Sequence, residues 1–166
     1  MIVFLIGFMG SGKSTAGKQL ALRLGYSFVD TDQLIVEKFG MTINEIFDSL
    51  GEEAFREGEA SLLNELISKR DLVVSTGGGL PCYGDNMDVI NNNGISVYLR
   101  LVPDALFNRL VFRKYKRPLI RDLSDEELRA FINEKLAERE PFYNKARHIL
   151  DGLKVNAGEL EKLVRG

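Results

Sequence analysis

The stretch that decides the fold is IVFLIGFMGSGKST, residues 2–15, in which a run of apolar residues leads directly into a glycine-rich loop. The apolar part, Ile2–Ile6, has the composition of a buried strand, and Lys13–Leu24 has the periodicity of a helix that ends at Gly25. Between them, Gly7–Ser14 matches the pattern G-x-x-x-x-G-K-[ST] in the strand–loop–helix context that this phosphate-binding motif requires. A chance match in a tight turn is the alternative, and the presence of all three elements favours the phosphate loop.

The motif gives each part of this loop a role. Glycines let the backbone N–H groups turn inward around a phosphate, and the following helix directs its positive end to the same place. We expect Lys13 to reach the β- and γ-phosphates of a nucleotide, and the hydroxyl of Ser14 to hold Mg²⁺. The predicted nucleotide-binding residues of the loop are Gly10, Ser11, Gly12, Lys13, Ser14 and Thr15.

Length and composition narrow the classes of protein that remain. At 166 residues the chain is long enough for one domain with its own core, and its net charge of −2 gives no basic excess for nucleic acid or an anionic membrane. The single cysteine, Cys82, excludes an internal disulfide. No apolar run is long enough to span a bilayer, and the first apolar segment is too short for the core of a signal peptide. We therefore expect a soluble, cytoplasmic protein without nucleic-acid or membrane partners.

Apolar, β-branched runs alternate with helical patterns along the chain. The predicted strands are Ile2–Ile6, Ser27–Asp30, Leu72–Thr76, Ile95–Leu99 and His148–Asp151. The predicted helices are Lys13–Leu24, one from Gln33, one capped by Thr42, Glu52–Arg70, one from Pro103 to about Phe112, one capped by Ser124, and a final helix after the fifth strand. Such alternation predicts a single α/β domain whose parallel sheet is covered by helices on both faces.

Two aspartates, Asp30 and Asp32, lie where the second predicted strand ends. In an open parallel sheet, ligands collect at the carboxyl ends of the strands. We expect Asp30 to act on Mg²⁺, directly or through water, and Asp32 to accept a hydrogen bond from a substrate hydroxyl. The alternative, which the residues leave equally open, is that Asp32 caps the helix from Gln33.

Three consecutive glycines, Gly77–Gly79, follow the third predicted strand. Their position indicates close approach of the backbone to a ligand, with N–H groups offered to an anion or a hydroxyl, and a flexible loop is the alternative. Many phosphate-loop proteins carry an acidic residue at the end of this strand, but Ser75 and Thr76 stand there in this chain.

Two arginines outside the glycine-rich segments have distinctive neighbours. Arg56 and Glu59 are three residues apart in a predicted helix, so they share a face and can pair, although a solvated surface pair is the more common meaning of this spacing. Arg139 precedes Pro141, which we expect to kink the helix or to begin a new one.

Basic residues concentrate in and just before Arg113–Asp122, a segment without a clear helical stripe. They are Arg109, Arg113, Lys114, Lys116, Arg117 and Arg121. In a site that transfers phosphate, such a segment acts as a mobile lid that closes over ATP and brings an arginine to the γ-phosphate. Solvated surface charge is the alternative.

Together these motifs resemble those of the shikimate kinases. The matching segments are GFMGSGKST, DTD, FREGE, STGGG, the RP of Arg117-Pro118 and the R-x-P-x-Y of Arg139–Tyr143, in the family's order and with similar spacing over nearly the whole chain. A gluconate kinase is the alternative among kinases of small metabolites, and FREGE with STGGG favours shikimate. A GTPase is disfavoured because no N-K-x-D motif follows a strand.

The resemblance implies transfer of phosphate from ATP, with Mg²⁺, to the 3-hydroxyl of shikimate, a step in making aromatic amino acids. It implies a three-layer α/β/α fold of the P-loop kinase type, which is a five-stranded parallel sheet with a mobile lid at about residues 113–122. We expect the protein to be a monomer. In such kinases shikimate is held by Asp32, Arg56, Arg139 and the backbone of Gly77, Gly78 and Gly79. Arg117 comes from the lid onto ATP, and Arg109 lies near the adenine. The predicted catalytic residues are Lys13, Asp32 and Arg117.

Overall fold

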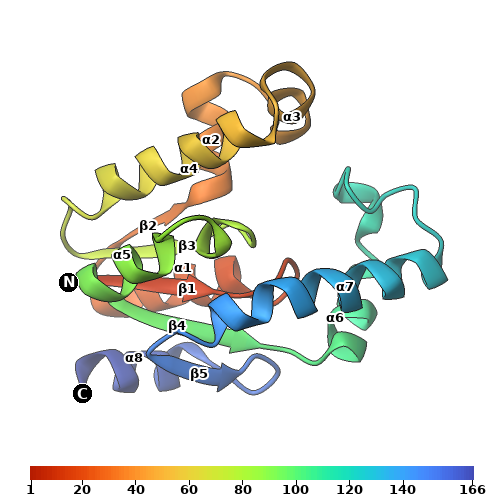
Figure 1. Ribbon diagram of the computed structural model, residues 1–166. Helices are drawn as coiled ribbons and strands as arrows, with labels where there is room; N and C mark the ends of the chain where they lie inside the picture. The colour runs from red at the N-terminus through yellow and green to blue at the C-terminus, as the bar shows by residue number, and fades with distance from the viewer.

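Five parallel strands form one sheet in the order β2-β3-β1-β4-β5 in the computed structural model, which describes residues 1–166 (Figure 1). The strands are β1 (Ile2–Ile6), β2 (Ser27–Asp30), β3 (Leu72–Ser75), β4 (Ile95–Arg100) and β5 (His148–Asp151). β1, which leads into the phosphate loop, is the central strand, and all of its residues are buried. The predicted strands are confirmed to within one residue at each end.

Eight α-helices and two short 3₁₀-helices connect the strands. The α-helices are α1 (Lys13–Leu24), α2 (Thr31–Phe39), α3 (Ile43–Leu50), α4 (Glu52–Leu66), α5 (Asn86–Asn93), α6 (Pro103–Leu110), α7 (Asp125–Tyr143) and α8 (Ala157–Arg165). The 3₁₀-helices are η1 (Leu80–Cys82) and η2 (Lys114–Lys116). None of the helices combines the length with the apolar composition that crossing a bilayer would need.

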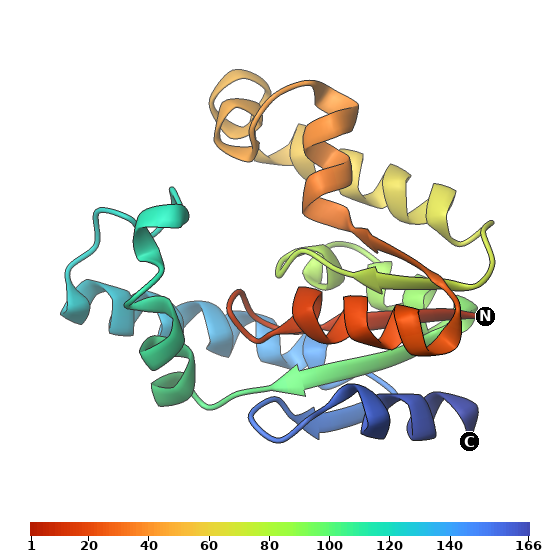
Figure 2. The same ribbon diagram turned by 180° about the vertical axis from the view of Figure 1, so that it is seen from behind.

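Alternate residues of the strands point to two apolar clusters, one on each face of the sheet. Val3 and Leu5 of β1 join the smaller cluster, which is completed by α1 and α8, while Phe4 and Ile6 join the larger one on the opposite face. Figure 2 shows α1 and α8 together in front of the sheet, and Figure 1 shows α5 and α7 on the other side. The predicted three-layer α/β/α architecture is confirmed.

The site lies at the end of the sheet that is formed by the carboxyl ends of the strands. In Figure 1 their carboxyl ends point to the right, between the helices α2, α3 and α4 at the top and the segment that follows α6. The phosphate loop leaves β1 at this end, and the glycines after β3 lie beside it, because a methyl group added at Gly78 would lie 3.8 Å from the carbonyl oxygen of Gly7. The predicted site residues leave the sheet at this end or reach it from a covering helix, except Arg117, which reaches it from the segment after α6.

Several local predictions were wrong. No helix was expected between β3 and β4, where the structure has η1 and α5, because the four asparagines of α5 are poor helix formers. Pro141 does not begin a new helix, since α7 continues through it and ends two residues later. Its missing N–H removes a bond from the last turn only, which limits the cost. The helices α4 and α6 end at Leu66 and Leu110, earlier than predicted.

The start of α2 also differs from the prediction. The helix begins at Thr31 and not at Gln33, and Asp30 is its N-cap, with a side chain that accepts hydrogen bonds from the N–H groups of Asp32 and Gln33. The alternative that Asp32 acts as the cap is therefore wrong. The Asp32 carboxylate is free to bind another group, because the Asp30 side chain already accepts the N–H groups at the start of the helix.

Candidate active site

The phosphate loop has the curled backbone that its glycines predict. Gly10 and Gly12 have φ angles of 78° and 91°, in the left-handed region that favours glycine. A Cβ at Gly10 would lie 2.9 Å from the Leu110 side chain, so the close packing of α6 against the loop also requires glycine there. Gly12 is the N-cap of α1, and no side chain caps the helix. The N–H groups at this end are therefore free for an anion.

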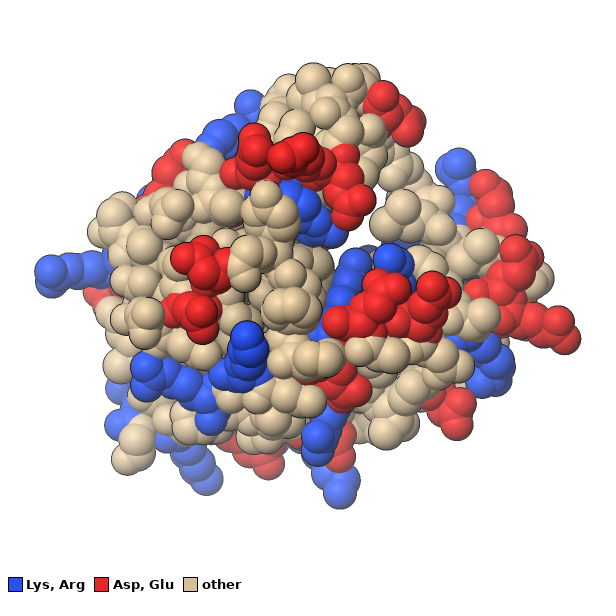
Figure 3. Space-filling model, viewed as in Figure 1, with Lys and Arg blue, Asp and Glu red and all other residues tan.

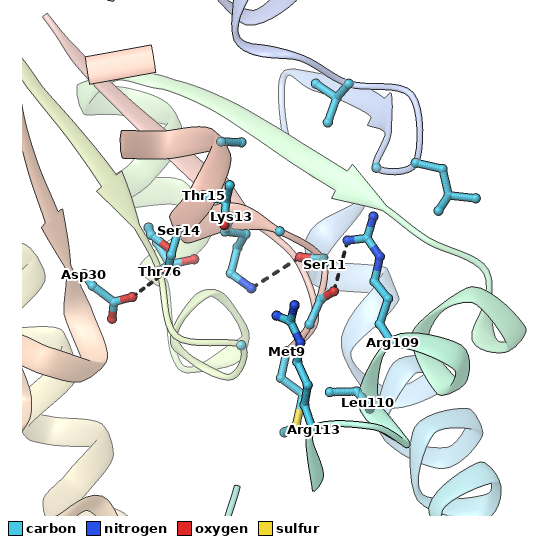
Figure 4. A pocket seen from close by; sticks show the side chains of 18 of the residues that line it. Met9, Ser11, Lys13, Ser14, Thr15, Asp30, Thr76, Arg109, Leu110 and Arg113 are labelled. Atoms are coloured by element: carbon cyan, nitrogen blue, oxygen red, sulfur yellow. Dashed lines mark hydrogen bonds between the residues drawn. The ribbon is translucent and has the colours of Figure 1, made fainter. Parts of the chain in front are cut away.

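Lys13 lies inside the curl of the loop (Figure 4). Its Nζ donates to the carbonyl oxygens of Gly7 at 2.7 Å and Phe8 at 2.9 Å, and contacts Ser11 Oγ at 3.5 Å. Burial lowers the pKa of Lys13 to about 8, against an opposing attraction from Asp32. The loop thus holds a desolvated cation at the place where a nucleotide phosphate would lie.

Side-chain oxygens that could bind a metal ion lie close together around Ser14, beside the loop. Its hydroxyl donates to Asp30 Oδ2 at 2.9 Å and lies 3.3 Å from Ser75 Oγ, while Asp30 Oδ1 caps α2. No cluster of three or more histidine, cysteine or acidic side chains forms a metal cage in this structure. Hydroxyl and carboxylate oxygens that leave room for phosphate and water suit Mg²⁺, which keeps several waters and is bound through few carboxylates. The donor set therefore fits the predicted ion.

Each glycine of the segment Gly77–Gly79 borders one predicted substrate-binding side chain. A Cβ at Gly77 would collide with a carboxylate oxygen of Asp32, and one at Gly78 would lie 2.8 Å from Nη1 of Arg139. A Cβ at Gly79 would lie 2.5 Å from the guanidinium nitrogens of Arg56. A larger residue at any of the three positions would therefore displace a predicted substrate-binding side chain. Close approach of this backbone to a ligand stays a prediction.

The N–H groups of this segment are not equivalent. The N–H of Gly77 donates to Thr31 Oγ1 at 2.7 Å, whereas those of Gly78 and Gly79 have no partner within the protein. The expectation that the N–H of Gly77 faces a ligand is therefore wrong, and for Gly78 and Gly79 it stays a prediction. Sequence reasoning missed Thr31, whose signal is a hydroxyl directly after the strand-ending aspartate.

Arg56 and Glu59 form a buried ion pair and not a solvated one. Arg56 Nη1 lies 2.5 Å from Glu59 Oε1, and the Glu59 side chain is only 1% exposed. Burial raises the pKa of Glu59 to about 7, although Arg56 opposes the shift. Burial and the nearby Asp30 also raise the pKa of Asp32. The acceptor side of the site therefore places two desolvated carboxylates among cations.

Arg139 reaches the same place from α7. Its guanidinium lies over the ring of Phe8, 5.5 Å from the centroid, and beside Gly78. Phe8 belongs to the phosphate loop, so this contact links the two sides of the site. Four residues on, the hydroxyl of Tyr143 donates to the carbonyl oxygen of Gly78 at 2.5 Å.

A cavity of about 770 Å³ extends from the phosphate loop. Its wall includes Asp30, Asp32, Gly78, Arg109 and Arg117, but not Arg56 or Arg139. Figure 3 shows the hollow at this end of the molecule, with basic side chains inside it. Arg109 Nη1 donates to the Gly10 carbonyl oxygen at 3.2 Å, which holds the arginine against the loop (Figure 4).

Sequence reasoning missed part of the cavity wall. The additional lining residues are Met9, Ala16, Gln19, Asn108, Leu110, Phe112, Gly152, Leu153, Val155, Asn156 and Ala157. Four of them, Gly152, Leu153, Val155 and Asn156, lie in the loop between β5 and α8. The signal for that loop was its position at the carboxyl end of a strand, where open α/β sheets bind ligands.

The predicted lid segment is anchored at both ends. Lys114 Nζ donates to the Leu123 carbonyl oxygen at 2.8 Å, and Ile120 is completely buried. Between these anchors, Tyr115 is 65% exposed, and Leu119 is 59% exposed. Arg117 nevertheless lines the cavity, and partial burial lowers the pKa of its guanidinium.

Comparison with known proteins agrees with this arrangement. A family model described as shikimate kinase matches residues 9–162. The chain belongs to the shikimate kinase family. A curated shikimate kinase of Phocaeicola vulgatus is 46% identical over 159 residues, which cover 96% of this chain and 88% of the relative. The predicted family and its kinase activity are confirmed.

Solved members of the family share the whole fold. A crystal structure of shikimate kinase from Bacteroides thetaiotaomicron has a TM-score of 0.94 at 39% identity and covers 100% of this chain and 99% of that one. A shikimate kinase from Acinetobacter baumannii, solved in complex with shikimate, has a TM-score of 0.85 at 34% identity, covering 99% and 90%. A gluconokinase from Sinorhizobium meliloti has a TM-score of 0.56 at 19% identity, which is a likeness of fold alone.

Proposed function

We propose that this chain transfers the γ-phosphoryl group of ATP to the 3-hydroxyl of shikimate, with the phosphate loop as the nucleotide site and the glycine segment Gly77–Gly79 as the acceptor site. The observation that carries this assignment is the set of contacts of the three glycines. One carboxylate, Asp32, and two arginines, Arg56 and Arg139, each border one glycine beside the phosphate loop. Shikimate has one carboxylate and several hydroxyls, and this set of groups matches them.

The nucleotide side supplies positive charge. Lys13 exchanges its bonds to the loop carbonyls for the β- and γ-phosphates, and the free N–H groups at the start of α1 bind the same phosphates. Arg109 borders the adenine, and Arg117 reaches the γ-phosphate from the lid, at about residues 113–122. Ser14, with Asp30 directly or through water, holds Mg²⁺, which neutralises phosphate charge when it is bound.

The acceptor side supplies orientation. The guanidinium groups of Arg56 and Arg139 bind the shikimate carboxylate, because planar forks offer it parallel hydrogen bonds. Asp32 accepts the hydrogen bond of the reacting hydroxyl and holds its oxygen in line with the γ-phosphorus. That oxygen forms the new P–O bond as the bond to the β-phosphate oxygen breaks and its own proton is released to the solvent, and ADP and shikimate 3-phosphate leave.

The test is an ADP-release assay with ATP, Mg²⁺ and a panel of acceptors: shikimate, gluconate, AMP and water. Of these four acceptors, we expect only shikimate to give rapid ADP release. Equal or faster release with gluconate would overturn the assignment in favour of the alternative kinase. A monomeric state and a cytoplasmic location stay predictions, and sedimentation of the active enzyme tests the first of them.

A further inference from the structure

The glycine segment is held by two hydroxyls that come from different helices. Thr31, the first residue of α2, accepts the N–H of Gly77 at 2.7 Å, and Tyr143, the last residue of α7, donates to the carbonyl oxygen of Gly78 at 2.5 Å. Thr31 and Tyr143 are both completely buried. Water therefore has no access to replace either partner.

The Tyr143 bond determines where the N–H of Gly79 points, and the Gly77 carbonyl, which accepts the N–H of Leu80 at 3.2 Å, does so for the N–H of Gly78. In a planar trans peptide the C=O and the N–H point in opposite directions, and the chain has no cis peptide bond. Because the Gly78 carbonyl is directed at Tyr143, the N–H of Gly79 in the same peptide points away from Tyr143. Neither this N–H nor that of Gly78 has a partner within the protein.

The Thr31 bond also fixes the distance between the acceptor carboxylate and the glycine segment. Asp32 follows Thr31 in the first turn of α2, and one of its carboxylate oxygens touches Gly77. The Tyr143 bond fixes the distance between Arg139 and the segment in the same way, because Arg139 lies one helical turn before Tyr143 on α7. The Arg139 guanidinium touches Gly78. Each hydroxyl therefore joins the backbone of the segment to the helix that carries one acceptor-binding side chain.

We propose that Thr31 and Tyr143 are positioning residues for the acceptor, and this inference rests on the acceptor site proposed above. Glycines have no side chains that packing could hold, and they sample more backbone conformations than other residues. The two hydroxyls restrict that freedom before the substrate binds, together with the backbone bonds from the N–H groups of Leu80 and Cys82 to the carbonyl oxygens of Gly77 and Gly79. The N–H groups of Gly78 and Gly79 are then already directed at the acceptor, so less conformational entropy is lost on binding.

The first test removes the acceptor atom at Thr31. Thr31→Val keeps the size of the side chain but leaves the Gly77 N–H without a partner, whereas Thr31→Ser keeps the hydroxyl. We expect Thr31→Val to lower kcat/KM for shikimate about tenfold, the usual effect of an unsatisfied buried donor. The change should appear mainly as a higher KM for shikimate, while KM for ATP stays within about twofold of the wild type and Thr31→Ser restores most of the loss.

Ser96→Ala is the matched control for this variant. Ser96 is also completely buried, and its hydroxyl accepts a backbone N–H, that of Arg147, at 2.8 Å, far from the site. Its loss should lower the melting temperature as Thr31→Val does, but it should leave KM for shikimate unchanged.

The second test is Tyr143→Phe, with Tyr98→Phe as its control. The two rings lie 5.0 Å apart and are both buried, but the Tyr98 hydroxyl donates to Glu140 and not to the glycine segment. We expect only Tyr143→Phe to raise KM for shikimate. Tyr143→Phe keeps the ring in the core, so it still tests whether the hydroxyls position the acceptor site if Thr31→Val fails to fold.

The outcomes separate the inference from the proposed function. If the wild type does not phosphorylate shikimate, the proposed function fails and the inference falls with it. If the wild type is active and Thr31→Val and Tyr143→Phe have the KM for shikimate of their controls, the inference alone is wrong. Equal losses toward ATP and shikimate would likewise overturn it, because they indicate general damage to the fold.

Discussion

The phosphate loop and the glycine segment lie side by side at the carboxyl end of the sheet, but they are held by different means. Lys13 of the loop is bound by carbonyl oxygens of Gly7 and Phe8, within the same short stretch of chain. The glycine segment is bound by hydroxyls of Thr31 and Tyr143, which lie 46 and 65 residues away along the chain. The lysine of the nucleotide half is thus held by local bonds, although Arg109 also reaches the loop from α6, whereas the acceptor half depends on the packing of several elements.

Their charged groups differ in the same way. The cation of the loop has only backbone and hydroxyl oxygens as direct partners, and burial lowers its pKa. On the acceptor side, Arg56 is paired with Glu59, a carboxylate with a raised pKa. Changes in the loop should therefore remove catalysis with little effect on the fold, while changes on the acceptor side should alter specificity and stability together.

The largest effect is expected from Lys13→Ala. The ammonium opposes the charge that develops on the transferred group, so turnover should fall on the order of 10²-fold or more, by analogy with the loss of an oxyanion-hole donor. The melting temperature should stay within a few degrees, because the lysine bonds only its own loop. Lys18→Ala, on the exposed face of the same helix, is the control and should keep its activity. Near-normal turnover in Lys13→Ala would remove the lysine from the mechanism.

Arg139→Lys tests the acceptor side and should have the next largest effect. A lysine keeps the charge but not the fork, so kcat/KM for shikimate should fall about ten- to a hundredfold, the range for a lost charged hydrogen bond. Arg129→Lys on the same helix is the control, since Arg129 stacks on Phe107 outside the site.

A shikimate analogue with its carboxylate reduced to an alcohol tests the same contact by changing the substrate and not the protein. The wild type should phosphorylate it poorly, and Arg139→Lys should discriminate less between the two acceptors. If the wild type accepts the alcohol as well as the acid, the carboxylate clamp does not exist.

The raised pKa of Glu59 predicts how the stability of the protein depends on pH. Its pKa is about 7 in the folded protein and 4.5 ordinarily, so between these values the folded state binds a proton that the unfolded chain has released. The free energy of unfolding should therefore decrease as pH rises from about 4.5 to about 7. The groups that face Glu59 are Arg56, Asp32 and Arg139, and Arg56 limits the shift.

Glu59→Gln isolates this contribution. Denaturant unfolding of both proteins at pH 5 and pH 8 should show that the wild type loses about 2 kcal/mol more than the variant between the two conditions. The other titrating groups are common to both proteins and, apart from Asp32, whose charge acts on Glu59, cancel in the difference. Identical losses would mean that Glu59 is ionised throughout this range.

The smallest effect is expected in the segment Arg113–Asp122. If it closes over bound nucleotide, its amide hydrogen exchange should slow when ATP-site and acceptor-site ligands are both present. The change should be greatest around Tyr115 and Leu119, which are exposed, and least at Ile120, which is already buried. Unchanged protection with both ligands bound would argue against a lid.

The sequence alone predicted the parts of this protein that are local. The phosphate loop is one continuous motif between a strand and a helix, so its glycines, Lys13 and Ser14 were recognisable from their spacing. Alternating apolar and amphipathic segments predicted the parallel sheet, because strands covered on both faces have no polar side. The asparagine-rich helix α5 was not predictable in this way, since packing overrides its weak propensity.

Only the tertiary structure decided how the acceptor half is assembled. The sequence left Asp32 equally open as a helix cap or a ligand, and the start of α2 at Thr31 gave the cap to Asp30. The same shift placed the Thr31 hydroxyl on Gly77 and took that N–H away from the substrate. Burial turned Arg56 and Glu59 from a presumed surface pair into an internal one. These outcomes depend on desolvation and on contacts between residues distant in sequence, which no local pattern contains.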